Sequence, residues 1–359
     1  MEIRAGEVYL MKGNEAIGEA AVRAGCMCYF GYPITPQNEL TEYMAKRMRE
    51  LGRVFLQTES EISTINMVYG AASTGVRVMT STSSPGASLM MEGISYIAGA
   101  ELPCVIVNVM RGGPGLGGIQ PSQSDYFQFV KGGGHGDYKL IVYAPSNLQE
   151  LVDYIFKAFD IAEKYRNPVA ILTDGLLGQM METVTFPEFI NKNENFSWAV
   201  GERKNREPNI ITSLQLDPKI LEQHNLKLAE KYRLAQEKEI VYDLEYIDDA
   251  EIILVAYGST ARICKSAIRE ARNLGLKVGL LRPISLWPFP SKIINKLAEK
   301  TKKFIVVEMS LGQMVEDVEL AVKGKAEVNF YGRAGGMVPT PKEILKVIID
   351  LQNKGSEKI

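Results

Sequence analysis

Glu61 is the acidic side chain that the sequence places best for moving a proton. It opens a helical stretch, and glycine follows at position 70 and at 75, ahead of a strand and a small-residue turn at 84–86. A carboxyl group at the start of a helix that packs on a sheet is held by rigid backbone. Burial there would raise its pKa and let it share a proton with a ligand. Glu59 is the nearest competitor, and a plain acidic residue favoured by the helix dipole is the other alternative.

A second candidate site is the loop YPITP at residues 32–36, between a predicted strand and a predicted helix. Thr35 suits the N-cap of that helix and Pro36 its first position. The amide groups at a helix N-terminus attract anions. The loop is therefore a candidate for binding a carboxylate.

Arg111 follows the apolar run CVIVNVM and opens the glycine-rich loop GGPGLGG. Ligands of open parallel sheets bind where strands end, and a guanidinium can hold a carboxylate or a phosphate of coenzyme A with two bonds. A surface arginine beside flexible glycines is the alternative. The glycines also suggest a dinucleotide site, but a proline interrupts them and no acidic residue follows at the required distance.

His135 lies in the glycine-rich segment GGGHGDY. On a mobile loop it could close over the site, with Asp137 to orient it, although a solvated loop histidine is an equal alternative. His224, the other histidine, lies in a charged stretch and has no predicted role.

Short apolar runs alternate with helical stretches along most of the chain, which predicts α/β units with mostly parallel sheets covered on both faces. Asn14 and Gly25 are the expected N-cap and stop of the first helix, and Ser146 with Gln149 has the spacing of a capping box. Strands are expected at 28–30, 76–80, 104–110, 140–144 and 168–174, and again at 252–258, 277–284, 303–309 and 328–332. The predicted domains are 1–190 and 246–359, joined by a polar connector at 191–245.

The composition excludes several classes of function. With 41 basic and 43 acidic residues the net charge is -2, so nucleic acid is not an expected partner. The N-terminus lacks the apolar core of a signal peptide and no apolar run is long enough to span a membrane, which predicts a cytoplasmic location. The cysteines at 26, 28, 104 and 264 fit neither a zinc nor an iron–sulfur spacing, and those at 26 and 28 are expected to be core thiols.

The stretch from Glu61 to the turn at 84–86 resembles the pyrimidine-binding helix region of thiamine-diphosphate enzymes. YPITP narrows the resemblance to the 2-oxoacid:ferredoxin oxidoreductases. The segments MKGNEAIGEAAVRAGC, YPITPQNE, VMRGGPGLGGIQPSQSDYFQ, KGGGHGDY and DGLLGQMME extend it over nearly the whole chain. They resemble the α subunit of the four-subunit enzymes, most closely the branched-chain type that acts on 3-methyl-2-oxobutanoate. The implied fold is a pyrimidine-binding α/β domain followed by a transketolase C-terminal-like α/β domain.

The resemblance also implies roles for residues. The Glu61 carboxyl would bond to N1′ of the aminopyrimidine, and Thr35 and Arg111 would contact the 2-oxoacid. Tyr32 and Pro33 would line the cofactor pocket together with Ser84 and Pro85. The segment LTDGLLGQ lacks the leading glycine and the later Asn-Asn pair of the element that binds magnesium and diphosphate in these enzymes. Magnesium and diphosphate are therefore expected on a partner chain, with no metal ligand in this one.

The implied reaction converts a 2-oxoacid, coenzyme A and oxidised ferredoxin to acyl-coenzyme A, carbon dioxide and reduced ferredoxin. A diphosphate-binding β subunit, a γ subunit and a ferredoxin-like δ subunit with the iron–sulfur clusters would complete the enzyme. The alternatives are a 2-oxoglutarate:ferredoxin oxidoreductase α subunit, the pyrimidine-side subunit of a lipoamide-linked dehydrogenase, a catalytically silent assembly subunit and a dinucleotide-dependent dehydrogenase. YPITP and the RGGPG loop argue against the lipoamide-linked class.

Overall fold

Seven strands form the larger sheet, in the order β12-β6-β7-β5-β4-β2-β3. The computed structural model describes residues 3–190, 196–201 and 206–356. Every neighbouring pair in this sheet is parallel except β12 with β6. The strands are β2 (Cys28–Gly31), β3 (Val54–Gln57), β4 (Val78–Thr82), β5 (Cys104–Met110), β6 (Ile141–Tyr143), β7 (Pro168–Asp174) and β12 (Ser285–Trp287).

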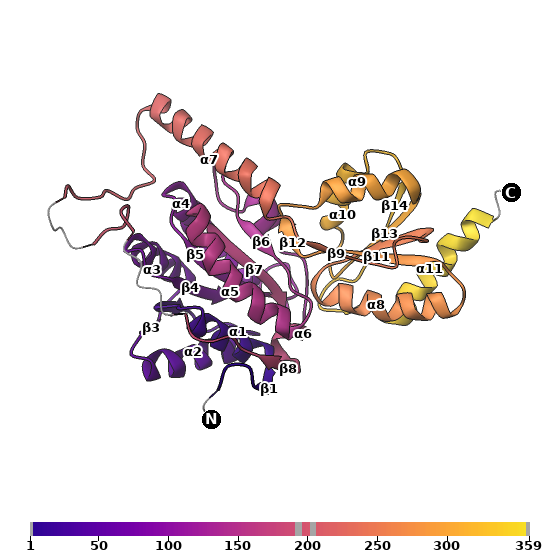
Figure 1. Cartoon of the computed structure of the whole chain (residues 1–359), viewed down its shortest axis with the longest axis horizontal. Coiled ribbons are helices and arrows are strands. Elements are labelled where there is room, and N and C mark those ends of the chain that lie inside the picture. Colours follow the sequence, from indigo (N-terminus) through magenta and orange to yellow (C-terminus); the bar gives the residue numbers. More distant parts are fainter. Residues whose placement is uncertain (1–2, 191–195, 202–205, 357–359) are drawn as a thin grey trace.

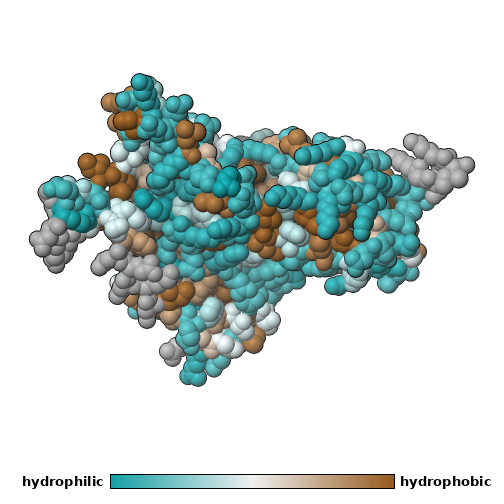
Figure 2. Space-filling model, turned by 45° about the horizontal axis from the view of Figure 1, so that its top comes forward, coloured by the Kyte–Doolittle hydropathy of each residue, from teal (hydrophilic) through white to brown (hydrophobic). Residues whose placement is uncertain are grey.

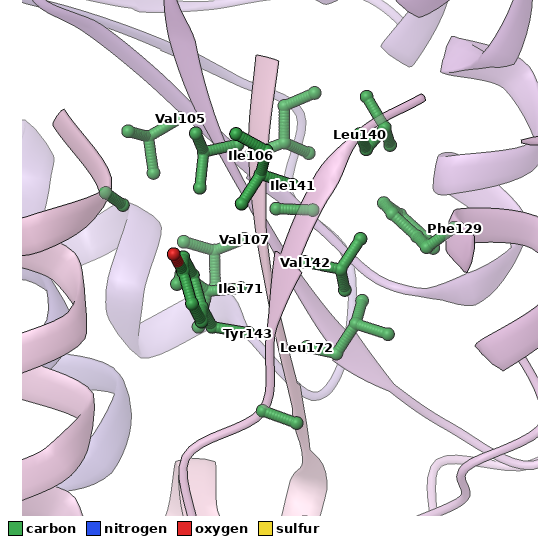
Figure 3. Close-up of a cluster of buried hydrophobic side chains, with 14 of the residues drawn as sticks. Val105, Ile106, Val107, Phe129, Leu140, Ile141, Val142, Tyr143, Ile171 and Leu172 are labelled. Atoms are coloured by element: carbon green, nitrogen blue, oxygen red, sulfur yellow. The ribbon is translucent and has the colours of Figure 1, made fainter. Parts of the chain in front are cut away.

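Helices cover both faces of this sheet (Figure 1). On one face α1 (Gly13–Arg23) packs on both α2 (Asn38–Glu50) and α5 (Leu148–Tyr165), and on the other α3 (Glu61–Ser73) packs on α4 (Ser84–Gly99). The central strands are buried on both sides, which is why they are rich in Val, Ile and Leu and show no apolar–polar alternation. Figure 3 shows side chains of β5, β6 and β7 meeting in this core. We call this sheet with its helices the N-terminal unit.

A second sheet forms the C-terminal unit, in the order β14-β13-β10-β11-β9. Only β9 runs antiparallel to its neighbour. One face carries α8 (Gly258–Asn273) and α11 (Pro341–Ser356), and the other carries α9 (Ser291–Lys300) and α10 (Met314–Val322). The strands are β9 (Tyr242–Glu245), β10 (Ile252–Val255), β11 (Val278–Pro283), β13 (Lys303–Glu308) and β14 (Glu327–Gly332). Two α/β units with mostly parallel sheets confirm the predicted fold class.

The two units are joined more closely than the predicted domain limits suggest. The strand β12 belongs to the predicted second domain by its position in the chain, but it completes the sheet of the N-terminal unit by pairing with β6. One buried apolar cluster also contains side chains of both units, among them Val107, Trp287 and Val306. The limits 1–190, 191–245 and 246–359 stay a prediction.

The remaining elements lie outside the two sheets. The strands β1 (Val8–Lys12) and β8 (Met181–Thr185) form an antiparallel pair, and α6 (Gly175–Gln179) follows β7. A π-helix, η1 (Gln128–Gly132), follows the glycine-rich loop. No helix among the described residues combines the length and the apolarity needed to cross a membrane.

The helix α7 (Pro218–Lys238) lies along the N-terminal unit and projects beyond it (Figure 1). Asp217 caps its first turn. Glu101 holds the helix by ion pairs with Lys227 and Lys231. Figure 2 shows apolar side chains exposed on this projecting part of the chain. The helix α7 and the segment before it, residues 206–217, carry Ile210, Leu214, Leu216, Ile220 and Leu226 in exposed positions.

Two predicted helix starts are wrong because the Asn14 side chain and the Pro36 carbonyl form hydrogen bonds with residues far away in the chain. Asn14 lies inside α1, and its side-chain amide donates to the Pro36 carbonyl and to Glu39. Thr35 and Pro36 form a turn, and α2 begins at Asn38. The Pro36 carbonyl accepts bonds from the side chains of Asn14 and Gln179, so it does not begin the helical ladder.

The predicted capping box of α5 is wrong by one residue. Asn147 is the N-cap and accepts from the Glu150 amide at 2.9 Å. Ser146 instead donates its amide and hydroxyl to the Glu150 carboxylate, and Gln149 bonds to Thr185 of β8. The predicted stop of α1 is confirmed, since Gly25 follows its end with a φ of 85°.

Candidate active site at the carboxyl edge of the larger sheet

Four neighbouring strands deliver the predicted site residues to one edge of the larger sheet. The strands β5, β4, β2 and β3 are adjacent and parallel, so their carboxyl ends lie together. Arg111 follows β5, Ser84 follows β4, Tyr32 follows β2 and Glu61 follows β3. Open parallel sheets bind ligands at this edge, where loops from different strands converge.

Glu61 is the first residue of α3 and is buried, with 5% of its surface exposed. Ser60 caps the helix, its hydroxyl accepting from the Ser63 amide. Burial raises the pKa of the Glu61 carboxyl, and the positive charge of Arg111 acts in the opposite direction. Within the described residues, no other side chain hydrogen-bonds to this carboxyl. It therefore keeps its bonding capacity for a ligand.

Gly86 makes room for the Glu61 carboxyl. A Cβ atom at position 86 would lie 2.3 Å from Oε1 of Glu61 and 2.2 Å from Oγ1 of Thr82. Gly93, further along α4, admits Ile65 of α3 in the same way, at 2.4 Å from its would-be Cβ. The glycines of α4 thus let α3 approach closely and fix the carboxyl against the helix beside it.

Glu59, the competing carboxylate, lies elsewhere. Its side chain is exposed and accepts bonds from the hydroxyls of Ser60 and Ser63. It serves the first turn of α3, and its bonding capacity is used locally. The geometry favours Glu61 as the proton-handling group.

Arg111 is buried, with 9% of its surface exposed, and ties two loops together. Nη1 donates to the Thr35 carbonyl and Nη2 to the Leu116 carbonyl, both at 2.9 Å. The buried Nε has no partner among the described residues. A guanidinium has five N–H groups, so donors remain for an anion after these two bonds.

The YPITP loop presents its side chains outward. Tyr32, Pro33 and Thr35 are exposed, whereas Pro36 is buried. Gln37, fully buried, donates to the Tyr32 carbonyl and accepts from Ser81 and Thr41. The exposed side chains are free to meet a ligand or a partner chain while the backbone below them is held.

Asn108 and Asp125 belong to the same site and were not predicted. The Ser84 hydroxyl donates to Oδ2 of Asp125 at 2.5 Å, and the Asn108 amide donates to the same oxygen at 2.8 Å. The Arg111 amide in turn donates to the Ser84 hydroxyl at 3.0 Å. Burial raises the pKa of Asp125 against the effect of these bonds. An asparagine inside the apolar run CVIVNVM was the signal in the sequence that pointed to a polar contact.

The loop after Arg111 closes on itself. Arg111 pairs with Pro121 as an antiparallel bridge, and the Gly112 amide donates to the Gln120 carbonyl. Gly117 has a φ of 57° and its would-be Cβ lies 1.7 Å from the Gly112 carbonyl oxygen, so only glycine fits there. Beside this loop lies a cavity of about 440 Å³ that both units line, with Ser84, Pro85, Asp125, Met309 and Leu311 among its residues.

His135 does not join these residues. Its ring contacts Tyr96 edge-on, with ring centroids 6.4 Å apart. Tyr96 lies 12 residues after Ser84 on α4, which is about 18 Å along a helix. His135 and His224 instead line a different cavity, between α4 and α7. The chain itself does not bring His135 to Glu61.

Asp174 and the cysteines have structural surroundings. Asp174 is buried and caps α6 by accepting from the amides of Leu176 and Leu177. Cys26, Cys104 and Cys264 are buried, Cys28 is half-buried, and all four are free thiols. Burial raises the pKa of Cys26 to about 12. Within the described ranges, no cluster of three or more His, Cys, Asp or Glu could hold a metal.

Family models match most of the chain. Residues 19–243 match the thiamine-diphosphate-binding domain of pyruvate flavodoxin/ferredoxin oxidoreductases, and residues 250–344 match core domain II of pyruvate:ferredoxin oxidoreductase. The chain belongs to the 2-oxoacid:ferredoxin oxidoreductase family. Thr35, Glu61 and Arg111 all fall in the first matched domain of this oxidoreductase family.

Relatives within the oxidoreductase family differ in their similarity to the chain. The ketoisovalerate oxidoreductase subunit VorB of Methanothermobacter marburgensis is 51% identical, over 97% of this chain and 99% of the relative. The 2-oxoglutarate synthase subunit KorA of the same organism is 37% identical, over 96% of this chain and 100% of the relative.

Solved structures agree with the family assignment. The 2-oxoglutarate:ferredoxin oxidoreductase from Magnetococcus marinus matches with a TM-score of 0.82 and 28% identity, covering 96% of this chain and 65% of that one. A split-gene transketolase shares the fold, with a TM-score of 0.59 and 14% identity over 95% of this chain and 97% of that one. Both matches confirm the predicted fold class.

Proposed function

We propose that this chain is the α subunit of a thiamine-diphosphate-dependent 2-oxoacid:ferredoxin oxidoreductase that acts on a branched-chain 2-oxoacid, 3-methyl-2-oxobutanoate. The observation that carries this function is Glu61, a buried carboxyl with a raised pKa and no other side chain bonded to it. Greater identity to a ketoisovalerate oxidoreductase subunit than to a 2-oxoglutarate synthase subunit supports the branched-chain substrate.

The residues at the edge of the larger sheet fit an aminopyrimidine ring. Glu61 would hold the ring nitrogen N1′, because its carboxyl is fixed by α3 and α4 and has bonding capacity left. Tyr32, Pro33, Ser84 and Pro85 would surround the ring from neighbouring loops. When bound, thiamine diphosphate supplies the carbanion chemistry that decarboxylation requires.

The chain's own contribution is a proton held at one atom and an anion held at another. Burial raises the pKa of the Glu61 carboxyl, which favours its protonated form and suits the exchange of a proton with a ring nitrogen. Arg111 and Thr35 would bind the 2-oxoacid carboxylate, Arg111 through its unused N–H groups and Thr35 through its exposed hydroxyl. The bonds from Arg111 to two loop carbonyls hold the guanidinium in place for this contact.

The other parts of the reaction belong to partner chains. We assign the diphosphate and Mg²⁺ to a β subunit and the iron–sulfur clusters to a ferredoxin-like δ subunit, with a γ subunit completing the complex. Coenzyme A is the acyl acceptor and ferredoxin the electron acceptor. The names of the relatives as subunits, and the coenzyme A bound in the Magnetococcus structure, support this division.

The test is turnover by the purified complex with a viologen dye as electron acceptor. We expect reduction of the dye with 3-methyl-2-oxobutanoate and coenzyme A, and no response to lipoamide or nicotinamide. Preference for 2-oxoglutarate would contradict the substrate assignment and favour a 2-oxoglutarate:ferredoxin oxidoreductase α subunit. Coenzyme A-independent or lipoamide-linked turnover would contradict the reaction class.

A further inference from the structure

Gln123 is a fully buried polar side chain where the two units meet. Its Nε2 donates to the Tyr257 carbonyl at 2.9 Å, and its Oε1 accepts from the Met309 amide at 3.0 Å and from the Thr260 hydroxyl. Its backbone amide donates to the Met309 carbonyl, and its carbonyl accepts from the Tyr257 hydroxyl. All three partners follow β10 or β13 of the C-terminal unit.

Filling space does not account for this arrangement. An apolar side chain of the same volume would pack at position 123 without needing the hydrogen bonds that the glutamine side chain makes. Buried polar groups that are fully bonded specify a single arrangement, because shifting one of them leaves several groups unpaired. Gln123 therefore fixes the position of its own segment relative to the C-terminal unit.

That segment adjoins Arg111, which is proposed to bind the 2-oxoacid. Gln123 lies two residues before Asp125, which bonds to Ser84, and two residues after Pro121, which pairs with Arg111. A second backbone contact lies at the start of the loop, where the would-be Cβ of Gly112 is 3.1 Å from the Gly336 nitrogen. The loop from 111 to 125 thus packs closely on the C-terminal unit at its start and is hydrogen-bonded to it at Gln123.

We infer that the C-terminal unit positions the 2-oxoacid pocket through Gln123, which acts as a positioning residue for Arg111 and Asp125. The inference rests on the proposed function, because it names the 2-oxoacid as the ligand whose binding depends on this anchor. The cavity of about 440 Å³ beside the loop has walls from both units, and Ser84 and Asp125 are among its lining residues. Ser84 bonds to Asp125 and to the Arg111 amide, so moving the anchored loop would shift Arg111 as well as the cavity wall. The C-terminal unit then has a role in substrate binding as well as in assembly.

Thr260 offers a matched pair of variants in the C-terminal unit, away from the pocket-lining residues. Thr260→Val keeps the shape and removes the hydroxyl that donates to Gln123, whereas Thr260→Ser keeps the hydroxyl. In the complete complex we expect Thr260→Val to raise KM for the 2-oxoacid roughly threefold or more, and Gln123→Leu roughly tenfold. The kcat and the affinity for thiamine diphosphate should stay near those of the parent, and Thr260→Ser should restore KM.

Glu150→Gln is the control, because Glu150 joins the same two units by two 2.8 Å bonds to Arg282 and does not line the pocket. It should lower the Tm of the complex without changing KM. An unchanged KM in Thr260→Val, or an equal rise of KM in Glu150→Gln, would overturn the inference. If Gln123→Leu does not fold, the comparison of KM in Thr260→Val and Thr260→Ser tests the inference by itself.

Hydrogen exchange separates this inference from the proposed function. Exchange of amides in residues 111–125 should be faster in Thr260→Val than in the parent complex, and unchanged in Glu150→Gln. An inactive parent complex would contradict the proposed function, and the exchange would still decide whether the anchor exists. Unchanged exchange in Thr260→Val would refute the claim that Gln123 fixes residues 111–125, whether or not the complex is active.

Discussion

The Glu61 carboxyl combines two features that rarely serve stability, burial and the lack of a side-chain partner among the residues described. A folded-state pKa above the unfolded value means that the folded protein binds the proton more tightly. The stabilising effect is then present at low pH and is lost as the pH rises through the folded pKa. At neutral pH the carboxyl costs stability, which indicates that it is kept for chemistry.

Glu61→Gln should abolish turnover without destabilising the complex. The amide keeps the volume but cannot exchange a proton with a ring nitrogen, so we expect a loss of at least roughly a hundredfold in kcat. The Tm at neutral pH should be equal to or above that of the parent, since no charge remains to be buried. Glu59→Gln is the control and should be mild, because Glu59 is exposed. Near-normal turnover in Glu61→Gln would remove the proposed role.

Gly86→Ala should displace the same carboxyl without removing it. The new Cβ would lie 2.3 Å from Oε1 of Glu61, which forces the carboxyl or α4 to move. We expect kcat to fall roughly tenfold or more, since misplacing a catalytic group by about 1 Å can cost a hundredfold. Gly70→Ala is the matched control, because a Cβ at position 70 of α3 meets nothing within 4 Å. Equal activity in Gly86→Ala and Gly70→Ala would contradict the claim that Gly86 makes room for the Glu61 carboxyl.

Thr35→Ala should weaken use of the 2-oxoacid more than binding of thiamine diphosphate. The Thr35 side chain is exposed, so its loss should leave the fold intact. Loss of one hydrogen bond to a charged carboxylate predicts a rise in KM of roughly tenfold. Steady-state kinetics and calorimetry of cofactor binding measure the two effects. Thr74→Ala, at the far end of α3, is the control, and a parental KM in Thr35→Ala would show that the substrate contact lies elsewhere.

At the scale of elements, the helix α7 depends on a small group of charges. Glu101 is buried beside Lys231, whose side chain is 12% exposed, and pairs with Lys227 as well. Burial lowers the pKa of Lys231 to about 8, although Glu101 acts in the opposite direction. Between that value and the ordinary pKa of lysine the unfolded chain binds more protons, so docking of α7 should strengthen as the pH rises above about 8.

Glu101→Gln should loosen α7 from the N-terminal unit. It leaves the buried Lys231 ammonium without its anion, at a cost of about 1 to 3 kcal/mol in the free energy of unfolding. Thermal denaturation and limited proteolysis of the segment around 206–217 measure the effect. Glu230→Gln breaks an exposed ion pair with Arg233 on the same helix and should change stability little. Equal effects of the two variants would contradict an anchoring role for Glu101.

The elements that the sequence predicted well are those with strong local signals. The strands β4 to β7, β10, β11 and β13 lie where their apolar runs indicated, because strands buried on both faces need no help from distant residues. The strand β14 also lies where it was predicted, although it is only partly buried, and β12 was not predicted. The strand β3 was missed, since it is short, lies at the sheet edge and is mostly exposed. The start of α2 and the pairing of β12 depend on contacts with residues far away in the chain, which no local pattern contains.

For the candidate site too, the sequence predicted the residues that have a local signal and missed those whose position depends on distant contacts. Glu61, Ser84 and Arg111 follow strands at one edge of the sheet, and for Ser84 and Arg111 the apolar runs before them indicate where those strands end. The anchoring role of Gln123 could not be foreseen, because its partners lie more than 130 residues later in the chain. The glycines around His135 suggest a loop that closes over the site, whereas its actual contact, Tyr96, lies on the distant part of α4.

At the scale of the whole molecule, the surface near Glu61 is apolar where a partner would cover it. Exposed apolar side chains flank the site on α3, α4, the glycine-rich loop and the C-terminal unit. They are Ile62, Leu89, Leu116, Ile119 and Leu311. Exposed apolar side chains around a ligand site indicate an interface with a partner chain.

The isolated chain should therefore bind thiamine diphosphate weakly and show no iron–sulfur absorbance. Adding the diphosphate-binding chain should raise cofactor affinity sharply, because completing a shared site links binding to assembly. Calorimetry with and without the partner measures the difference. Tight, magnesium-dependent binding by this chain alone would refute a site shared between subunits.

The pairing of β12 with β6 also bears on how the chain is made. During translation the N-terminal unit leaves the ribosome first, but its sheet keeps the edge of β6 open until residues 285–287 have been synthesised. Open strand edges can pair with other chains. The nascent protein therefore carries an unprotected edge from the completion of β6 until β12 has been made, and ending the chain at residue 245 would make that exposure permanent.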